Sequence, residues 1–187
     1  MADLQPKEVV NVPEAMMQAN TLFAGRRYRD AATLLQKVIA QEPRNAAAYH
    51  LLGVVAHHAG NNLPKAIELV QRALELSPKD GQIATNLTEL LRLAQRRDEA
   101  IDMGKRATQL APRSAAAHSN LGIAYYDAGR FAEAEESQKR AIAIDPTHAS
   151  ALNNLGSIRR VMHDPEGAIS HYRKVMLLHP TDRKSVV

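Results

Sequence analysis

Residues 119–146 read SNLGIAYYDAGRFAEAEESQKRAIAIDP, and this stretch decides the fold. Its first half has apolar residues at every third or fourth position, which predicts a helix over residues 115–128 with Ser114 as its N-cap. Gly129 follows, and glycine favours the left-handed backbone that ends many helices. The second half predicts another helix over residues 131–144, which the following Asp-Pro pair ends. The stretch therefore predicts a helical hairpin.

The rest of the chain repeats this hairpin with a period of about 34 residues. Prolines recur at intervals of 35, 34, 34 and 34 residues, at Pro43, Pro78, Pro112, Pro146 and Pro180. Twelve residues before each proline stands an alanine: Ala31, Ala66, Ala100, Ala134 and Ala168. A leucine followed by a small residue precedes the last four prolines: Leu52-Gly53, Leu87-Thr88, Leu121-Gly122 and Leu155-Gly156. Coincident periods of this length indicate an array of structural repeats.

The small residues of each repeat predict close packing of its two helices. A larger side chain at these positions would push the two backbones apart. One hairpin cannot bury both of its faces, so successive hairpins are expected to stack and form a continuous core. The sequence thus predicts an all-α fold built as a solenoid.

This pattern resembles the tetratricopeptide repeat family, and residues 115–148 carry its Leu-Gly, Tyr, Gly, Phe, Ala, Ala and Pro in the expected places. The resemblance implies a right-handed superhelical solenoid of antiparallel helix pairs. We expect five repeats, at residues 12–45, 46–80, 81–114, 115–148 and 149–182. Residues 1–11 are expected to form a flexible N-terminal tail, and residues 183–187 a C-terminal tail or the start of a missing repeat.

Several residues depart from the family pattern. Repeat 1 has Gln18 where the leucine belongs, and we expect it to be an N-terminal cap. Repeat 3 has Gln95 in place of the turn glycine and Gly104 where a bulkier residue is usual. In the same repeat we expect Asp80 to cap the first helix and Asp98 the second. Repeat 5 has Arg159 at a usually aromatic position and His163 at the turn.

Three asparagines predict a peptide-binding surface. Asn86, Asn120 and Asn154 stand twenty-six residues before successive prolines, on the first helices that are expected to line the concave face. An amide matches the donors and acceptors of a peptide backbone, and this ladder is similar to the one in O-linked N-acetylglucosamine transferases. Neighbours that are expected to add side-chain preference are Glu89, Tyr126, Asp127 and Arg160. The alternative is that asparagine is simply frequent before Leu-Gly in this family.

Other binding modes are not favoured by the sequence. The family's carboxylate clamp for chaperone tails needs basic residues, but the corresponding concave positions hold His50, Val54, Thr85, Glu89, Ser119 and Ile123. His50 and His57 lie two helical turns apart, about 10 Å along the axis, which is too far for one metal ion. A basic residue repeats along the second helices at Lys37, Arg72, Arg106, Arg140 and Lys174, and Glu68, Asp102 and Glu136 stand four positions before the middle three. No aromatics are interleaved for base stacking, so no nucleic-acid partner is expected.

No catalytic or cofactor-binding motif is found. The chain has no cysteine, no glycine-rich phosphate loop and no nucleophile elbow. We therefore predict a protein that is no enzyme, binds no cofactor or metal, and holds an extended segment of another protein in its concave groove. The alternative is the N-terminal targeting arm of a larger enzyme, such as a bacterial glycosyltransferase resembling the O-linked N-acetylglucosamine transferases.

Two further expectations concern location and self-association. Residues 1–20 lack the basic start and apolar run of a signal peptide, and no stretch approaches the ~18 apolar residues of a membrane span, so we expect a soluble, cytoplasmic protein. The last helix has apolar residues at helical spacing, at Ala168, Ile169, Tyr172, Val175 and Met176. This face predicts self-association or docking of further sequence, since a terminal repeat normally needs a polar cap.

Overall fold

The computed structural model describes residues 9–60 and 62–178, and all ten of the helices in these residues are α-helices. The chain divides into two compact units, Met1–Pro78 and Lys79–Val187. Helices of 13 to 15 residues are about 20–22 Å long. Within the described residues, none has the length and apolar character needed to cross a bilayer.

The N-terminal unit contains two helix pairs. They are α1 (Val12–Ala24) with α2 (Tyr28–Gln41), and α3 (Ala46–Gly60) with α4 (Leu63–Leu76). Each helix packs on the next along the chain, and α1 also contacts α3. Leu35, Val38 and Val55 are almost completely buried between these helices, together with the alanines at the predicted close-packing positions.

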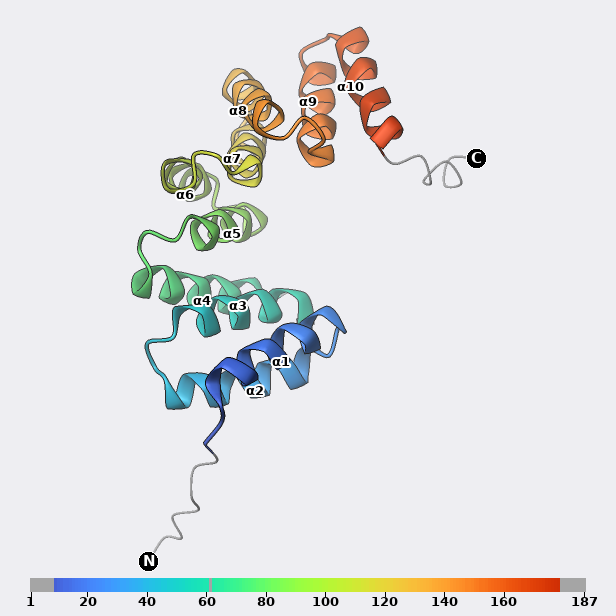
Figure 1. Ribbon diagram of the computed structural model, residues 1–187. Coiled ribbons are helices and arrows are strands. Elements are labelled where there is room, and N and C mark those ends of the chain that lie inside the picture. The colour runs from blue at the N-terminus through green and yellow to red at the C-terminus, as the bar shows by residue number, and fades with distance from the viewer. Residues whose placement is uncertain (1–8, 61, 179–187) are drawn as a thin grey trace, which may run out of the picture. The chain divides into compact units, whose positions relative to one another are not determined.

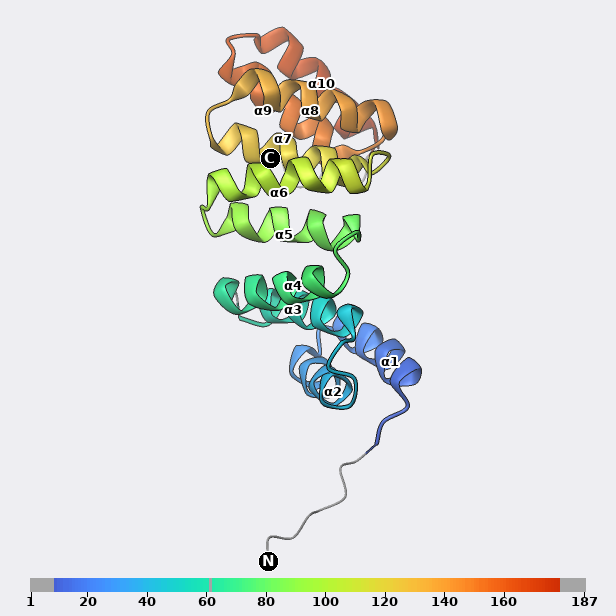
Figure 2. The same ribbon diagram turned by 90° about the vertical axis from the view of Figure 1, so that its left-hand side faces the viewer.

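The C-terminal unit contains three helix pairs. They are α5 (Gly81–Leu93) with α6 (Arg97–Leu110), α7 (Ala115–Asp127) with α8 (Phe131–Ile144), and α9 (Ala149–Val161) with α10 (Pro165–Leu178). The two helices of each pair lie side by side, as α5 and α6 do in Figure 2. Contacts also join α5 to α7 and α7 to α9, so the first helices form one continuous layer of this unit (Figure 1). The all-α prediction is confirmed, and so is the packing in consecutive antiparallel pairs.

Helix ends follow the predicted turn chemistry with one exception. Ser114 and Asp80 cap α7 and α5, since their side chains accept bonds from the backbone N–H of Ala117 (3.2 Å) and of Gln82 (2.9 Å). Asp98, which the sequence favours as the cap of α6, is instead inside its first turn, because α6 already begins at Arg97.

Within the described residues, the turns inside four of the helix pairs use a left-handed residue. Gly129 has φ +75°, and the residues that replace glycine there keep the same conformation, with φ 58° at Arg26, 59° at Gln95 and 61° at His163. A left-handed residue other than glycine costs roughly 1–2 kcal/mol. The fold therefore imposes this turn even where the sequence lacks the residue best suited to it.

Glycines on the first helices make room for larger residues on the second. A Cβ atom added to Gly53 would lie 2.5 Å from Val70 Cγ2, and one added to Gly156 would lie 2.6 Å from Tyr172 Cε1. Repeat 3 reverses the arrangement, because its first helix carries the buried Thr88 and its second helix carries Gly104. Thr88 and Gly104 are thus one exchange of volume across the helix pair.

The boundary predicted for the N-terminal tail falls partly within the described residues. Residues 1–8 lie outside them, as do residues 179–187, which include the predicted C-terminal tail. Val10, however, exchanges two hydrogen bonds with the Gln41 side chain, at 3.0 and 3.1 Å, and Asn11 caps α1. The packed chain therefore begins before residue 11, because α2 supplies partners for its backbone.

Candidate peptide-binding face

The seven predicted contact residues all lie on the first helices of the C-terminal unit. Helix α5 carries Asn86 and Glu89, α7 carries Asn120, Tyr126 and Asp127, and α9 carries Asn154 and Arg160. Glu89, Asp127 and Arg160 are exposed, while the three asparagines and Tyr126 are half-buried. The layer α5–α7–α9 is therefore the face on which any peptide-binding site built from these residues would lie.

The three asparagines are equivalent in sequence but not in their hydrogen bonds. Asn120 Nδ2 donates to the Thr85 carbonyl on α5 at 3.3 Å. Asn86 Oδ1 accepts from Gln82 Nε2 at 3.0 Å. Asn154 Nδ2 is buried and has no partner. The sequence reasoning treats the three amides alike, whereas in the structure the Asn120 amide already links two neighbouring helices.

Gln138 explains why Asn154 differs from Asn120. One repeat after Thr85 stands Ser119, whose carbonyl is the counterpart of the one that Asn120 contacts. That carbonyl already accepts a hydrogen bond from Gln138 Nε2, at 3.0 Å. Gln138 is completely buried, and its Oε1 has no partner. The sequence reasoning missed this residue, although its polarity at a position with the core period was a usable signal.

A cavity of about 190 Å³ lies beside these two amides. Its lining comes from α7, α8 and α9: Ile123, Tyr126, Asp127, Gln138, Asn154, Ser157 and Ile158. Three of the seven predicted contact residues are among them. The Tyr126 ring is held against Phe131, with 5.5 Å between ring centroids, and Asp127 pairs with Arg92 of α5 at 3.1 Å. Arg92 also escaped the sequence reasoning.

Comparison with known proteins agrees with this architecture. Family models described as tetratricopeptide repeat match residues 16–81 and 115–148, which together make up just over half of the chain. The chain belongs to the tetratricopeptide repeat family. No protein of curated function matches this sequence.

Solved tetratricopeptide repeat structures share the fold at low sequence identity. MamA 41-end from Desulfovibrio magneticus RS-1 is 18% identical, with a TM-score of 0.78 and coverage of 96% of this chain and 99% of that one. TTC0263 from Thermus thermophilus is 22% identical, with a TM-score of 0.78 and coverage of 92% and 94%. YrrB, described as having an unusual peptide-binding site, is 21% identical, with a TM-score of 0.68 and coverage of 90% and 86%. At these identities the likeness concerns the fold alone.

Two of the positions predicted to line the open face of this tetratricopeptide repeat array are in fact buried. Thr85 and Ser119 are 2% and 1% exposed, and the Thr85 hydroxyl bonds to the Gly81 carbonyl of its own helix. These positions face the neighbouring helix because α5, α7 and α9 pack directly on one another. Ile123 does line the cavity, and Glu89 is exposed.

Arg159, the charged residue at a usually aromatic position of the tetratricopeptide pattern, joins three elements. Its guanidinium contacts Glu135 of α8 at 2.5 Å and Asp164, which precedes α10, at 3.0 Å. Asp164 Oδ1 also accepts from the Gly167 backbone N–H, and this bond, together with Arg159, lowers the pKa of Asp164. The ion pairs link α9 to α8, both of which line the cavity, and to the residue that precedes α10.

The apolar face predicted on α10 is divided between two sides of the helix. Ala168 is buried, and Tyr172 packs on Gly156 with its hydroxyl 3.2 Å from Ser157 Oγ. Ile169 and Met176 are 49% and 59% exposed. The exposed apolar surface is therefore smaller than the sequence indicates, because the α9–α10 pair already uses part of the stripe.

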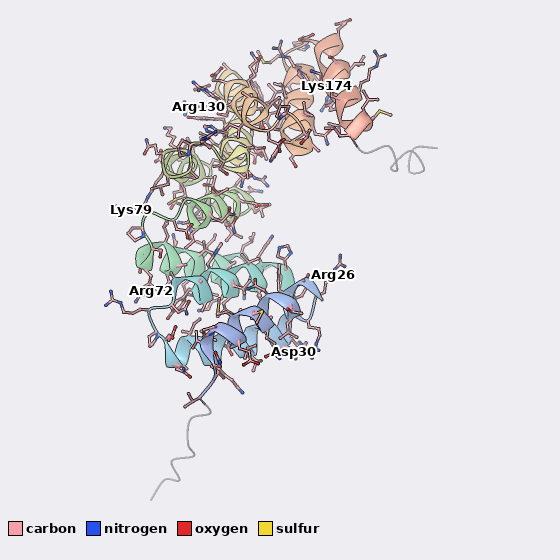
Figure 3. All side chains as sticks on the ribbon, viewed as in Figure 1. Arg26, Asp30, Arg72, Lys79, Arg130 and Lys174 are labelled. Carbon is pink, nitrogen blue, oxygen red and sulfur yellow. The ribbon has the colours of Figure 1, made fainter. Side chains whose placement is uncertain are left out.

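The second helices carry most of the exposed charge. Figure 3 labels two of these cations, Arg72 on α4 and Lys174 on α10, and also Arg130 in the turn before α8. The predicted pairing of Arg72 with Glu68 differs, because Arg72 pairs with Glu75 at 2.8 Å and Glu68 pairs with Lys65 at 2.8 Å. The predicted pair of Arg140 with Glu136 is present at 3.4 Å. Exposed pairs of this kind contribute little to stability, because water and salt screen them.

Proposed function

We propose that this protein is an interaction scaffold that binds an extended segment of another protein along the α5–α7–α9 layer. Tetratricopeptide repeat proteins generally act in protein–protein interactions, and the YrrB structure is described as containing a peptide-binding site. The observation that carries the proposal is the cavity between α7, α8 and α9, with its unpartnered buried amide atoms. Unpaired buried polar groups cost about 1–3 kcal/mol each, so a ligand that pairs them gains affinity.

The dimensions of the layer suit an extended chain. Packed helices lie about 8–10 Å apart, and an extended peptide advances about 3.3 Å per residue, so equivalent positions on α5, α7 and α9 would meet roughly every third peptide residue. A volume near 190 Å³ is large enough for one side chain but smaller than the roughly 300–1,000 Å³ of typical small-molecule pockets. The site therefore favours a peptide that inserts a single residue.

Charges at the edge of the cavity add selectivity. Asp127 and Arg92 form an ion pair whose side chains remain 33% and 23% exposed, so both groups can contact a bound segment. Exposed Glu89 and Arg160 lie on the neighbouring first helices. In the alternative of a targeting arm attached to an enzyme, the substrate segment would bind this same face.

The test begins with selection of binding peptides from a random displayed library on the full chain, followed by calorimetric titration of variants. Asn154→Ala and Tyr126→Ala should each weaken binding by about 0.5–1.5 kcal/mol, roughly 2- to 13-fold. Asn86→Ala and Asn120→Ala should have smaller effects, because both amides already have partners within the protein.

Gln109→Ala is the matched control, since Gln109 is exposed on α6 and lies outside the first-helix layer. Circular dichroism establishes that each variant is folded. If the library gives no binding peptide, or if Gln109→Ala weakens binding as much as Asn154→Ala does, the α5–α7–α9 layer is not the binding face.

A further inference from the structure

We propose that the cavity between α7, α8 and α9 recognises the side-chain carboxamide of a glutamine or asparagine in the bound segment. This inference rests on the proposed function, because it specifies which residue of the peptide the cavity accepts. It starts from two buried atoms of opposite hydrogen-bonding character, the acceptor Gln138 Oε1 and the donor Asn154 Nδ2, neither of which has a partner. Both residues line the same cavity.

The orientation of the Gln138 amide is fixed by its surroundings. Gln138 Nε2 donates to the Ser119 carbonyl at 3.0 Å, so exchanging the nitrogen and oxygen would place two oxygens against each other. A Cβ atom at Gly122 would lie 2.5 Å from Gln138 Nε2, so the glycine is what lets the amide lie against α7. Gln138 therefore presents an acceptor that it cannot turn away, and its side chain is fully buried.

The two unpartnered atoms together favour a ligand group that both donates and accepts hydrogen bonds. A primary carboxamide offers an N–H for Gln138 and a carbonyl for Asn154 within one plane. A carboxylate has no donor for Gln138 Oε1, and an ammonium group has no acceptor for Asn154 Nδ2. Asp127 at the same cavity further disfavours a carboxylate, and Ile123 and Ile158 provide apolar walls for the methylene groups of the ligand.

The volume agrees with this assignment. A cavity of about 190 Å³ exceeds the ~30 Å³ share of one water molecule and is close to that of an engineered cavity of about 150 Å³ that binds benzene. It can therefore admit the end of one side chain. A site built to pair both a donor and an acceptor should discriminate against isosteres that leave one of them unpaired.

The first experiment tests the cavity without any peptide. Propionamide, propionate and propylammonium are titrated separately into the isotopically labelled full chain, and the side-chain NH₂ signals of Gln138 and Asn154 are followed by NMR. Propionamide should shift both signals with a dissociation constant in the millimolar range, and the two charged analogues should bind at least about tenfold more weakly. Equal responses to all three probes, or none to propionamide, would mean that the cavity has no preference for a carboxamide, and the inference would be overturned.

The second experiment uses peptides selected on the wild type. One position should be enriched in glutamine or asparagine, and a glutamine-to-glutamate change there should weaken binding at least about tenfold. Gln138→Leu removes the acceptor that distinguishes glutamine from glutamate, so it should abolish this preference. Asn154→Leu removes the donor without adding a charge and should weaken binding of the glutamine peptide, whereas Asn153→Leu, at the exposed neighbour on α9, should leave it intact. The comparison of these two asparagine variants keeps the proposal testable if Gln138→Leu does not fold.

The outcomes separate the two proposals. If peptides bind the α5–α7–α9 layer but show no carboxamide preference, and propionamide does not bind, the inference fails and the proposed function stands. If no peptide is selected while propionamide binds as expected, the cavity has the predicted chemistry and the proposed function fails.

Discussion

The exchange of volume between Thr88 and Gly104 makes a quantitative prediction about stability. Thr88 is completely buried on α5, and a Cβ atom at Gly104 would lie 3.2 Å from its Cγ2 atom and 3.0 Å from Leu121 Cδ1. We consider Gly104→Val, which restores the bulk usual for this position, Thr88→Gly, which restores the usual glycine, and the double variant.

Each single change should destabilise the protein. Gly104→Val overpacks the interface and should cost about 1–3 kcal/mol, offset by a few tenths from better helix propensity. Thr88→Gly should cost about 1–2 kcal/mol, since it removes a buried methyl group worth ~0.8 kcal/mol and adds a flexible residue to a helix. In the double variant the new methyl groups occupy the vacated space, so its cost should fall below the sum of the single costs by about 1–2 kcal/mol. Compensation stays incomplete because Leu121 Cβ also lies 3.2 Å from the added atom.

Urea denaturation followed by circular dichroism measures all four proteins. Combining Thr88→Gly with Lys174→Ala provides the control, because Lys174 is exposed on α10 and the two changes should add within about 0.5 kcal/mol. A double variant as unstable as the sum of the single variants would refute the exchange, and Thr88 and Gly104 would then be unrelated substitutions.

Three further predictions concern packing, turn geometry and association. Ala134→Leu should cost about 1–3 kcal/mol in denaturation experiments because Ala134 is fully buried between α7 and α8, whereas Ala132→Leu at an exposed position should change little. His163→Gly should raise the free energy of unfolding by about 0.5–1 kcal/mol, because glycine relieves the cost of the positive φ by more than it adds in unfolded-chain entropy. The urea midpoint should rise accordingly, and an unchanged or lower midpoint would contradict this. We also expect weak self-association through the exposed Ile169 and Met176, which sedimentation should detect and which Ile169→Glu with Met176→Glu should abolish; a strictly monomeric wild type at high concentration would count against it.

Most of the helix pattern could be predicted from the sequence because its determinants are local. Gly129 takes a left-handed backbone at the predicted turn, and Pro43, Pro78, Pro112 and Pro146 fall just beyond second helices. The misplaced cap at Asp98 shows where local reasoning fails. Aspartate is a strong capping residue, but Gln95 occupies the left-handed turn position, so the helix must begin two residues later at Arg97, as α8 begins two residues after Gly129. Alignment with the neighbouring repeat would have outweighed the residue preference.

The binding face could be predicted only in part, because equal spacing does not give equal surroundings. Asn120 and Asn154 occupy the same position in successive repeats, but their hydrogen bonds differ. The Asn120 amide donates to the preceding repeat, whereas the Asn154 amide nitrogen has no partner. The Thr85 carbonyl is available to Asn120, whereas Gln138 already bonds the corresponding carbonyl of Ser119. A change on a second helix thus alters the chemistry of a first helix.

Gln138 causes the difference between Asn120 and Asn154, and comparison of the repeats could have revealed it. The other repeats place Leu35, Val70, Gly104 and Tyr172 at this position. A fully buried amide at a position that elsewhere holds an apolar residue, an aromatic residue or glycine needs hydrogen bonds to offset its burial. The Gln138 nitrogen has such a bond, and its oxygen has none. Residues that recur in every repeat mainly determine how the helices pack. Specificity for a partner has to come from positions at which one repeat differs from the others, and the buried acceptor of Gln138 beside the unpaired donor of Asn154 is such a difference.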